Sequence, residues 1–582
     1  MKLTTLNDVL LIAGSKGEAT VAMRQDAGGA WHSIASSEMM GHVRGLAAWL
    51  RAQGVTKGDR VALIAENRWE WAVTDFATMA VGAVGVPLFP TLTADQTAAQ
   101  LKDSGAKICV VSTADLAKKV LGSQKVTSVE TVVLMETKDP FAGVVMFADA
   151  IASAPNADFE TLLKSVGPDD LATIIYTSGT TGDAKGVMLT HGNVASNLSM
   201  TTDLYGSFTA KDSCVSFLPL SHVTARHIDY LFYALDVTVA YCGKVERLLP
   251  AFQAIKPTIF VAVPRLYERI RHSVEQKSAA SPVKKKILAW AIGVGCKHQK
   301  TLLAGNTPGS LSWKLANKLV YSKVKAAFGG RVETFISGGA PLGLDLANWF
   351  AYAAILIREG YGLTETSPVI SVNLPGRHKI GTTGPTMPNL ECRIAEDGEL
   401  EVRGPSVFKG YWQKPEATAE AIDPEGWFHT GDVGNIDAEG FLSITDRKRE
   451  LIKTTNGKFI APQPIENRLK VSSLIGYAAL QGDGRKFISV LMTPNFATLE
   501  AQGIKGERDA LVKDAAVLSL YQAEIERVNE TLAPFEKIKK FRLLPVEWGI
   551  DTGEVTPSMK LKRRIVAQKH ASEIASMYGG ED

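Results

Sequence analysis

Residues 174–186 read Ile-Ile-Tyr-Thr-Ser-Gly-Thr-Thr-Gly-Asp-Ala-Lys-Gly, directly after an apolar run that is typical of a β-strand. The glycines let the backbone turn tightly and present N–H groups to an anion, the Ser and Thr hydroxyls add donors, and Lys185 adds positive charge. The stretch therefore predicts a phosphate-binding loop. It is not a Walker A loop, because Lys185 is followed by Gly186 instead of Ser or Thr. On composition alone, a flexible Ser/Thr/Gly connector is the alternative.

Strand-like and helix-like patterns alternate on both sides of this loop. Residues 61–64, 108–111, 132–134 and 259–263 are short apolar runs rich in β-branched residues, as in strands covered on both faces. Residues 41–52 carry apolar side chains at helical spacing. The alternation predicts an α/β fold with parallel sheets. Further strands are expected at 441–444 and 488–492, and a helix at 517–532.

Composition excludes several classes of protein. The 582 residues include 64 Lys and Arg against 61 Asp and Glu, so the net charge of +3 is too small for the chain as a whole to bind nucleic acid. Five widely separated cysteines give neither a CxxC metal pattern nor a disulfide framework. The N-terminus lacks a signal-peptide pattern, and the apolar stretch 71–89 is interrupted by Asp, Gly and Pro, which indicates buried core. We expect a reduced, cytoplasmic protein.

The loop also belongs to an ordered series of motifs. Residues 176–186 resemble the signature loop of the AMP-forming adenylating enzymes, which include acyl-CoA synthetases, firefly-type luciferases and peptide-synthetase adenylation domains. Further motifs follow in that superfamily's order and extend the resemblance over essentially the whole chain: Ser-Gly-Gly-Ala-Pro at 337–341, Tyr-Gly-Leu-Thr-Glu-Thr at 361–366, Trp-Phe-His-Thr-Gly-Asp at 427–432, Asp-Arg-Lys-Arg-Glu at 446–450 and Thr-Pro-Ser-Met-Lys-Leu-Lys-Arg at 556–563.

The resemblance implies an architecture and a reaction. It predicts an α/β chain with a large N-terminal AMP-binding domain (1–445) of stacked parallel and mixed sheets with helices, a hinge at 446–449 and a small, mobile α+β C-terminal lid domain (450–582). Such enzymes activate a carboxylate by its attack on the α-phosphorus of ATP, release pyrophosphate and pass the acyl group to a thiol. Because the substrate carboxylate is the nucleophile, no Ser/His/Asp triad is required, and positioning and charge neutralisation are left to the protein.

The resemblance also assigns roles to individual residues. The phosphate loop comprises Thr177, Ser178, Gly179, Thr180, Thr181, Gly182 and Lys185. Gly338, Gly339 and Ala340 line the adenine, Tyr361 lies along it, and Gly362 is a further nucleotide-binding residue. Asp432 accepts hydrogen bonds from the ribose hydroxyls with help from Arg447, and Thr364 donates to the α-phosphate. Glu365 and Thr177 hold Mg²⁺, a hard cation that takes oxygen ligands. Lys560 bridges the carboxylate and the α-phosphate, with Lys562 as a competing register.

Two further regions follow from the same resemblance. Asp446 and Arg449 belong to the hinge about which the lid domain rotates between half-reactions. Lys453 and Gly457 lie in a loop that faces the thiol of coenzyme A. His222 sits near the carboxylate or lines the mouth of the acyl tunnel, with a buried structural histidine as the alternative.

The strings at 263–270 and 456–462 are most similar to long-chain fatty-acid–CoA ligases. Thr224 and Ala225 depart from the aromatic residue and the Glu that long-chain members usually have after the histidine, so chain length stays open. The alternatives are a fatty-acyl-AMP ligase that loads a carrier protein, an aryl or medium-chain acyl-CoA ligase, and a lipid-binding membrane scaffold with an inactive site. Oligomeric state is unknown.

Residues 271–325 are strongly basic. They carry eleven Lys and Arg residues against the single acid Glu275, and apolar or small residues fill 287–296. The apolar run is too short to span a bilayer. The basic segment as a whole suits a peripheral contact with the inner face of a membrane. The alternative is a solvated pair of amphipathic helices that packs Leu311, Leu315 and Leu319 against its own domain.

Overall fold

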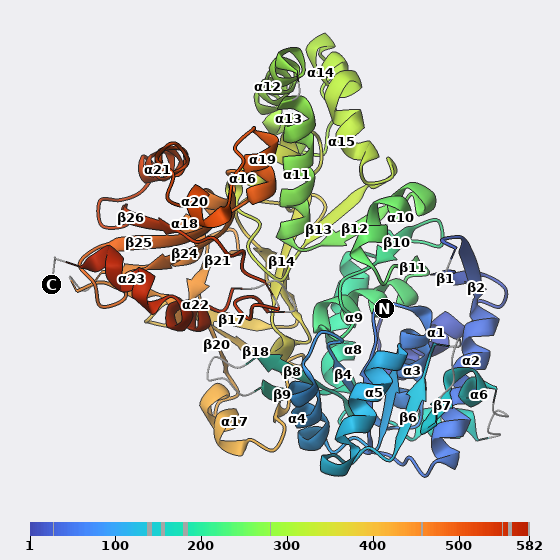
Figure 1. The fold of residues 1–582 in the computed structure, drawn as a ribbon. Coiled ribbons are helices and arrows are strands. Elements are labelled where there is room, and N and C mark those ends of the chain that lie inside the picture. The colour runs from blue at the N-terminus through green and yellow to red at the C-terminus, as the bar shows by residue number, and fades with distance from the viewer. Residues whose placement is uncertain are drawn as a thin grey trace.

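The computed structural model describes residues 1–26, 28–136, 142–152, 158–178, 184–279, 281–455, 458–549, 551–556 and 561–579. The loop residues 179–183, together with Asn456, Gly457 and Lys560, lie outside the described residues. Figure 1 shows an N-terminal part built on large sheets, a C-terminal part beside it and a helical projection at the top.

One sheet of the N-terminal part carries the phosphate loop. In the described residues its strand order is β19-β9-β8-β4-β3-β5-β6-β7. The expected strands at 61–64, 108–111 and 132–134 are all present here and pair in parallel, as their apolar runs predict. The strands are β3 (Arg60–Ile64), β4 (Val84–Leu88), β5 (Ile108–Val111), β6 (Thr131–Leu134), β7 (Val144–Met146), β8 (Leu171–Ser178), β9 (Ala184–Thr190) and β19 (Gly410–Tyr411).

A second large sheet lies beside the first, with the order β15-β14-β13-β12-β10-β11-β1-β2 over the described part of the chain. The strands β12, β13 and β14 run parallel, so their carboxyl ends share one edge of the sheet. The strands are β1 (Thr20–Gln25), β2 (Trp31–Ala35), β10 (Ser213–Ser216), β11 (Thr238–Tyr241), β12 (Ile259–Ala262), β13 (Thr334–Ser337), β14 (Ile357–Gly362) and β15 (Val369–Val372).

Helices cover these sheets and begin and end as their sequences dictate. In α4, Thr93 and Gln96 exchange side-chain-to-backbone hydrogen bonds of 3.3 and 3.1 Å, and Gly105 ends the helix in the left-handed conformation. The helices of this part include α1 (Leu6–Gly14), α2 (Ser36–Ala52), α3 (Trp69–Ala80), α4 (Ala94–Ser104), α5 (Ala114–Ser123), α6 (Phe147–Ile151), α7 (Phe159–Lys164), α8 (His191–Leu204), α9 (Val223–Ala234), α10 (Leu248–Ile255) and α16 (Leu344–Tyr352). The expected helix at 41–52 is the larger part of α2.

A third, antiparallel sheet leads toward the C-terminal part. Its order among the described residues is β16-β21-β20-β18-β17, and β20 and β21 place Asp432 opposite Arg447. The expected strand at 441–444 is part of β21. The elements are β16 (Gly384–Pro385), β17 (Glu391–Ile394), β18 (Glu399–Arg403), α17 (Pro415–Ala421), β20 (Phe428–Ile436) and β21 (Phe441–Arg447).

The C-terminal part has its own hydrophobic cluster, which runs from Ile452 to Leu543. The strands β24-β25-β26 form its sheet, and the expected strand at 488–492 and helix at 517–532 appear as β25 and α21. Its elements are β22 (Ile452–Lys453), β23 (Phe459–Ile460), α18 (Pro462–Lys470), β24 (Ile475–Gln481), β25 (Ile488–Pro494), α19 (Phe496–Ala501), α20 (Arg508–Leu511), α21 (Ala515–Asn529), β26 (Ile538–Leu543), α22 (Arg563–Lys569) and α23 (Ala571–Tyr578).

The basic segment forms the helical projection of Figure 1. Its helices are α11 (Pro264–Ala279), α12 (Pro282–Lys297), α13 (Gln299–Leu303), α14 (Leu311–Ala316) and α15 (Ser322–Ala326). Trp313 and Tyr321 are buried between them and join the core beneath the second sheet. Among the described residues, no helix is long and apolar enough to cross a membrane.

One buried carboxyl makes the stability of the fold depend on pH. Asp229 of α9 accepts a hydrogen bond of 3.2 Å from Ser216, and burial raises its pKa from 3.8 to about 7. Because the native state then binds more protons than the unfolded chain, stability should fall as pH rises from about 4 to 7, by up to about 4 kcal/mol. Asp229→Asn should flatten this slope in urea unfolding followed at several pH values. The exposed control Asp115→Asn should keep the slope; an unchanged slope in Asp229→Asn would contradict the assignment.

Candidate active site

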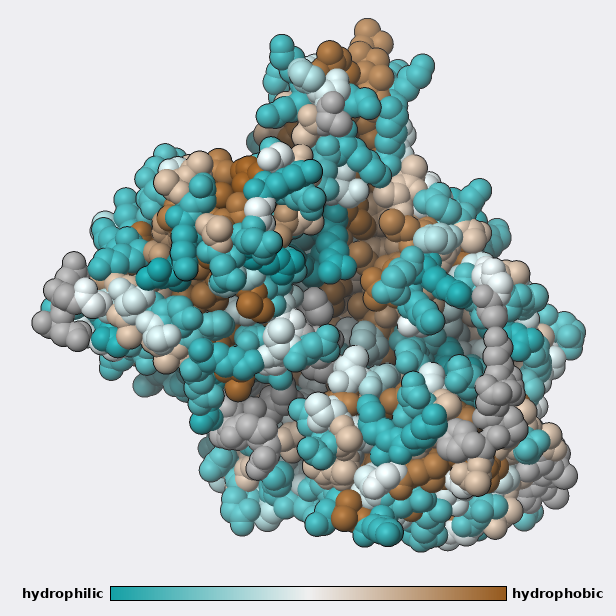
Figure 2. All heavy atoms as spheres, in the orientation of Figure 1, coloured by the Kyte–Doolittle hydropathy of each residue, from teal (hydrophilic) through white to brown (hydrophobic). Residues whose placement is uncertain are grey.

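A continuous cleft with a volume of about 3470 Å³ separates the N-terminal sheets from the C-terminal part. Figure 2 shows it as a hollow near the centre of the molecule. The cleft brings together residues that lie far apart in the sequence. The predicted site residues that line it are Thr177, Lys185, His222, Gly338, Gly339, Ala340, Tyr361, Gly362, Thr364, Glu365, Asp432, Asp446, Arg447 and Arg449. Lys453 is not among its lining residues.

The phosphate loop connects two antiparallel strands. Thr177 in β8 lies opposite Lys185 in β9, and its hydroxyl donates to the Lys185 carbonyl at 3.5 Å. The two residues therefore flank residues 179–183, which contain Gly179, Thr180, Thr181 and Gly182 and lie outside the described residues. The hairpin fixes both ends of the predicted loop at the cleft.

Glu365 sits beside this hairpin, in a short 3-10 helix (Thr364–Thr366) that contacts β9. Its carboxylate is buried, and burial raises its pKa above the ordinary value. Tyr411 donates its hydroxyl to the Glu365 carboxylate at 3.1 Å, and the Lys185 ammonium lies 4.9 Å from the centre of the Tyr411 ring. The sequence motifs did not point to Tyr411, because its place beside Glu365 arises from the pairing of β19 with β9.

Asp432, in the middle of β20, forms a second polar cluster with residues at the ends of β14 and β21. Its carboxylate accepts a hydrogen bond of 2.6 Å from the Tyr361 hydroxyl and lies 3.3 Å from the Arg447 guanidinium. Burial and the negative Asp432 raise the pKa of Tyr361 well above its ordinary value. Burial acts to lower the pKa of Arg447, but the charges of Asp432 and Glu450 outweigh it and raise that pKa. Tyr361 and Arg447 together hold the Asp432 carboxylate in one orientation.

The backbone conformation or a close backbone contact requires glycine at two positions of the cleft. Gly339 follows β13 with a φ of +80°, a left-handed conformation that side chains disfavour. A Cβ on Gly362 would meet the Pro368 carbonyl oxygen at 1.8 Å, so the close approach of β14 and β15 requires glycine there. Gly338 and Ala340 flank Gly339 after β13, so this stretch of the cleft wall carries no side chain larger than a methyl group.

His222 lines the cleft at the N-terminus of α9. Its Nδ1 accepts a hydrogen bond of 3.2 Å from the Thr224 backbone, so the neutral ring carries its proton on Nε2. Thr224 and Ala225 also line the cleft, whereas the next residue, Arg226, is buried and pairs with Asp75. The two residues that differ from the long-chain pattern therefore lie on the cleft wall beside the histidine.

The predicted hinge begins where β21 ends. Asp446 is buried and accepts hydrogen bonds from the backbone N–H groups of Gln463 at 3.0 Å and Arg447 at 2.7 Å. Burial raises the pKa of Asp446 to about 6. The side chain of Arg449 faces the cleft. Asp446 thus links the last strand of the third sheet to the first turn of α18 in the C-terminal part.

The segment that contains Lys560 is bounded by two firm contacts. Val555 pairs with Leu561, and the Lys562 N–H donates to the Glu554 carbonyl at 2.7 Å. Arg563 then makes two hydrogen bonds of 2.6 Å to Glu466. Residues 557–560, Lys560 included, lie outside the described residues, but Lys562 and Arg563 on their C-terminal side line the cleft.

The predicted coenzyme A loop lies between β22 and β23. Lys453 pairs with Phe459, and its ammonium lies 5.4 Å from the centre of that ring. Phe459 is exposed, and Gly457 lies outside the described residues.

Comparison with known proteins defines the class. Residues 13–412 match the AMP-binding enzyme family, and residues 449–582 match the C-terminal domain of AMP-binding enzymes. The chain therefore belongs to the family of AMP-binding enzymes. The long-chain-fatty-acid–CoA ligase FadD15 of Mycobacterium bovis is 38% identical over 95% of this chain and 93% of its own length. The peroxisomal long chain acyl-CoA synthetase 7 of Arabidopsis thaliana is 33% identical, over 90% of this chain and 78% of its own.

Solved structures confirm the predicted fold. The A domain of carboxylic acid reductase from Segniliparus rugosus, in complex with AMP and a carboxylic acid, superposes with a TM-score of 0.75 at 20% identity, covering 99% of this chain and 94% of its own. ATP-bound MatB from Rhodopseudomonas palustris gives a TM-score of 0.73 at 23% identity, covering 97% and 99%. The α/β class and the resemblance to AMP-forming enzymes are both confirmed.

Proposed function

We propose that this protein is a long-chain fatty-acid–CoA ligase that forms AMP. It activates a fatty acid with ATP to give acyl-AMP and pyrophosphate, and then transfers the acyl group to coenzyme A. The observation that carries the proposal is the convergence of Glu365, the Asp432–Arg447 pair and the β8–β9 hairpin on one cleft. Curated relatives that match nearly the whole chain carry the same activity in their names, which supports the choice of substrates.

In the first half-reaction the protein's task is to position ATP and the fatty acid. Asp432 accepts hydrogen bonds from the ribose hydroxyls, since its carboxylate is held in place by Tyr361 and Arg447. The open wall at Gly338–Ala340 receives the adenine. Thr364 donates to the α-phosphate, and Lys560 reaches both the attacking carboxylate and the α-phosphate. Charge that grows on the phosphates in the transition state is neutralised by these fixed donors.

The residues beside the hairpin fit a magnesium ion. Glu365 offers one buried carboxylate and Thr177 one hydroxyl, both hard oxygen donors that line the cleft. The described residues contain no cluster of three or more His, Cys, Asp or Glu that would suit a fully protein-ligated metal. A site with two protein oxygens suits Mg²⁺, which keeps waters and substrate phosphates as its other ligands. When bound, the ion would neutralise phosphate charge.

Tyr411 is proposed to hold Glu365 in place, and Tyr411→Phe tests this. The variant keeps the ring beneath Lys185 but removes one hydrogen bond to a carboxylate, worth about 1–2 kcal/mol. We expect the Mg²⁺ concentration for half-maximal adenylation, and for half-maximal ATP binding in equilibrium dialysis, to rise about five- to thirty-fold. The apparent Kd for ATP without Mg²⁺ should not change. An unaltered Mg²⁺ requirement would show that Glu365 is held by other contacts.

The second half-reaction requires the C-terminal part to change its pose. We divide the chain into an N-terminal domain (1–445), a hinge (446–449) and a lid domain (450–582). Asp446 anchors the hinge to α18 through the Gln463 N–H, and Arg449, the last hinge residue, lines the cleft. Rotation about this hinge withdraws Lys560 and brings the loop of Lys453 and Gly457 to the cleft for coenzyme A.

The proposed partners are a fatty acid, ATP and coenzyme A, with no nucleic acid. Because a long alkyl chain partitions into lipid, the proposal includes a cytoplasmic location with peripheral contact of residues 271–325 at the inner face of a membrane.

The overall reaction is tested with purified protein, ATP, Mg²⁺, palmitate and coenzyme A. We expect equal amounts of AMP, pyrophosphate and palmitoyl-CoA, and no thioester when coenzyme A is omitted. Parallel reactions with acids from acetate to C18 define the substrate. Pyrophosphate release without any coenzyme A thioester, but with acylation of an added carrier protein, would instead identify a carrier-protein loading enzyme.

A further inference from the structure

Part of the cleft lies between two helices and the second sheet. Tyr205 and Leu231 line it from the end of α8 and from α9, and Val261, Ile336 and Val372 line it from β12, β13 and β15. All five side chains belong to one hydrophobic cluster or pack against it. Such walls suit the apolar chain of a fatty acid, and we call this part of the cleft the acyl branch.

Three polar side chains interrupt the apolar wall of the acyl branch, namely Thr201, Tyr205 and His227. The Thr201 hydroxyl lies 3.1 Å from two backbone carbonyl oxygens of α8 and 3.2 Å from Nε2 of His227. Burial lowers the pKa of His227 to about 3, so its ring is neutral. Thr201 and His227 therefore satisfy each other within the protein.

Tyr205 has no such partner. Its side chain is 4% exposed and lines the cleft, and its hydroxyl forms no hydrogen bond with the described residues. The Tyr205 ring stacks on Phe208 with 5.4 Å between the ring centres. Burial raises the pKa of the Tyr205 hydroxyl to about 12, so the group keeps its proton and can donate it in a hydrogen bond. A buried donor without a partner is unfavourable, and an oxygen atom of a ligand would satisfy it.

Arg358 brings positive charge to the same end of the branch. It lies in β14 directly beside Ile336 of β13, so its side chain leaves the sheet on the face that carries Ile336. Its guanidinium donates to the Thr334 hydroxyl at 3.3 Å and makes no ion pair within the described part of the chain. The charge of Arg358 acts to lower the pKa of Tyr205, against the effect of burial. Because Arg358 is not among the cleft-lining residues, Tyr205 is the group that meets a ligand, and Arg358 favours an electronegative atom there.

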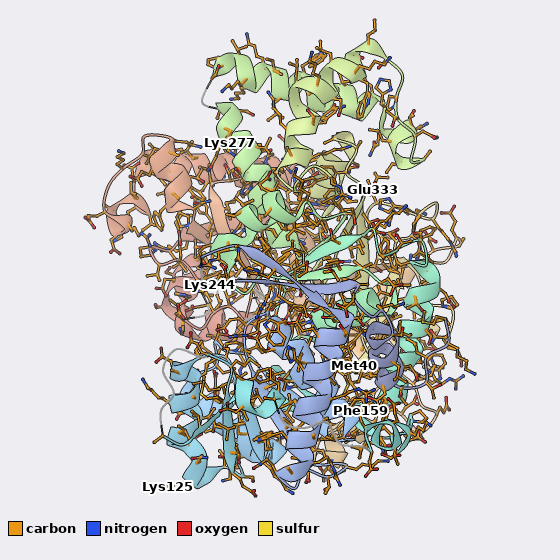
Figure 3. The ribbon with its side chains drawn as sticks, turned by 90° about the vertical axis from the view of Figure 1, so that its right-hand side faces the viewer. Met40, Lys125, Phe159, Lys244, Lys277 and Glu333 are labelled. Carbon is orange, nitrogen blue, oxygen red and sulfur yellow. The ribbon has the colours of Figure 1, made fainter. Side chains whose placement is uncertain are left out.

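This polar end lies deep in the cleft. Figure 3 labels both ends of the second sheet: Lys244 follows β11 at the carboxyl end, and Glu333 precedes β13 at the amino end. In β14, Arg358 lies near the amino end, four residues before Gly362 at the carboxyl end, which is about 13 Å along the strand. With carbon–carbon bonds of about 1.5 Å in an extended zigzag, this span corresponds to about ten carbon atoms of an acyl chain.

We propose that the acyl branch favours fatty acids that carry a neutral oxygen, such as a hydroxyl group, about ten carbons from the carboxylate. Tyr205 donates its hydroxyl to that oxygen, while the apolar walls hold the chain before and after it. The inference rests on the proposed function, because it names the substrate class of the same cleft. A second carboxylate on the chain is disfavoured, since one donor does not compensate for its loss of hydration. Unsubstituted fatty acids also fill the branch but leave the Tyr205 hydroxyl unpaired.

The selectivity is measured with three matched acids: stearate, stearate with a hydroxyl on its tenth carbon, and stearate with a hydroxyl on its second carbon. Pyrophosphate–ATP exchange at limiting concentrations of each acid gives kcat/KM without coenzyme A. For the wild type, we expect the tenth-carbon isomer to exceed stearate by about ten-fold, as for one added hydrogen bond, and the second-carbon isomer not to exceed it. In Tyr205→Phe the ratio should fall to about one or below, while the value for stearate changes by less than about three-fold.

Tyr233→Phe is the matched control. Tyr233 is also buried, in α9, but its hydroxyl is already paired with that of Tyr241 at 2.8 Å, and it is not among the cleft-lining residues. This variant should keep the wild-type ratio between the hydroxylated acid and stearate. A ratio that falls equally in both variants would mean that general disturbance of the fold, and not the Tyr205 hydroxyl, sets the preference.

Displacement of a fluorescent fatty acid in the absence of ATP measures the same preference as a ratio of Kd values. The two claims then fail separately. Absence of exchange with any acid would refute the ligase but leave the binding preference measurable. Equal Kd and kcat/KM values of the wild type for stearate and its tenth-carbon hydroxy derivative, or a preference that persists in Tyr205→Phe, would overturn the inference.

Discussion

Glu365→Gln should reduce the rate of fatty-acid adenylation by about 10²–10³-fold, which is the usual cost of removing one group that stabilises transition-state charge. The substitution keeps the size of the side chain and its contact with Tyr411 but removes the negative charge that the proposed Mg²⁺ requires. The single-turnover rate of acyl-AMP formation is the direct measurement. The apparent Kd for Mg²⁺-ATP should rise, while the unfolding midpoint should change little.

Glu359→Gln is the matched control for this variant. Glu359 also lines the cleft, and burial raises its pKa to about 7, so its carboxyl carries only part of a charge at neutral pH. We expect its adenylation rate to stay within about three-fold of the wild type, a change of less than about 1 kcal/mol. Equal losses in the two variants would mean that general disturbance of the cleft, and not the charge of Glu365, limits the reaction.

Arg226→Met should lower stability by about 3–5 kcal/mol, because it leaves a buried carboxylate without its cation. Arg226 and Asp75 are both almost fully buried, and the guanidinium also donates to the Thr173 hydroxyl at 2.7 Å. The cluster ties α3, β8 and α9 together beneath the cleft. The shift of the urea unfolding midpoint, followed by tryptophan fluorescence, measures the loss.

Two comparisons separate charge burial from lost packing. Arg226→Met/Asp75→Leu removes both charges and should recover much of the loss. Arg44→Met breaks a surface ion pair with Glu160 of similar length, 2.8 Å, and should cost no more than about 1 kcal/mol. If the double variant were less stable than Arg226→Met alone, the ion pair would not be the reason for the effect.

Much of the fold could be predicted from the sequence, because the patterns that mark strands and helices lie within short stretches of the chain. The apolar runs at 61–64, 108–111 and 132–134 became parallel strands, since a strand buried on both faces needs apolar residues at successive positions. The Arg226–Asp75 pair could not be predicted in this way: its partners lie 151 residues apart, and each is unremarkable in its own helix. The alternative that packs Leu311 and Leu315 inward does not hold, since both side chains are exposed, and helical spacing alone does not say which face meets the core.

In the candidate active site, too, contacts between segments that are distant in the sequence were the part that could not be predicted. Ordered motifs predicted that Asp432 and Arg447 act together, and the structure places them 3.3 Å apart. They did not predict Tyr411, whose contact with Glu365 depends on the pairing of β19 with β9 across more than 200 residues. Gly362 was predicted to bind the nucleotide, whereas its lack of a side chain is already required by the Pro368 carbonyl.

The central claim is that the cleft activates a fatty acid by joining it to AMP, and pyrophosphate–ATP exchange tests it without involving any thiol. Purified protein is incubated with ATP, Mg²⁺, radiolabelled pyrophosphate and palmitate, in the absence of coenzyme A. We predict incorporation of label into ATP that requires palmitate and is lost in Glu365→Gln. Label incorporation no greater with palmitate than without any acid, from protein that remains folded, would contradict the account.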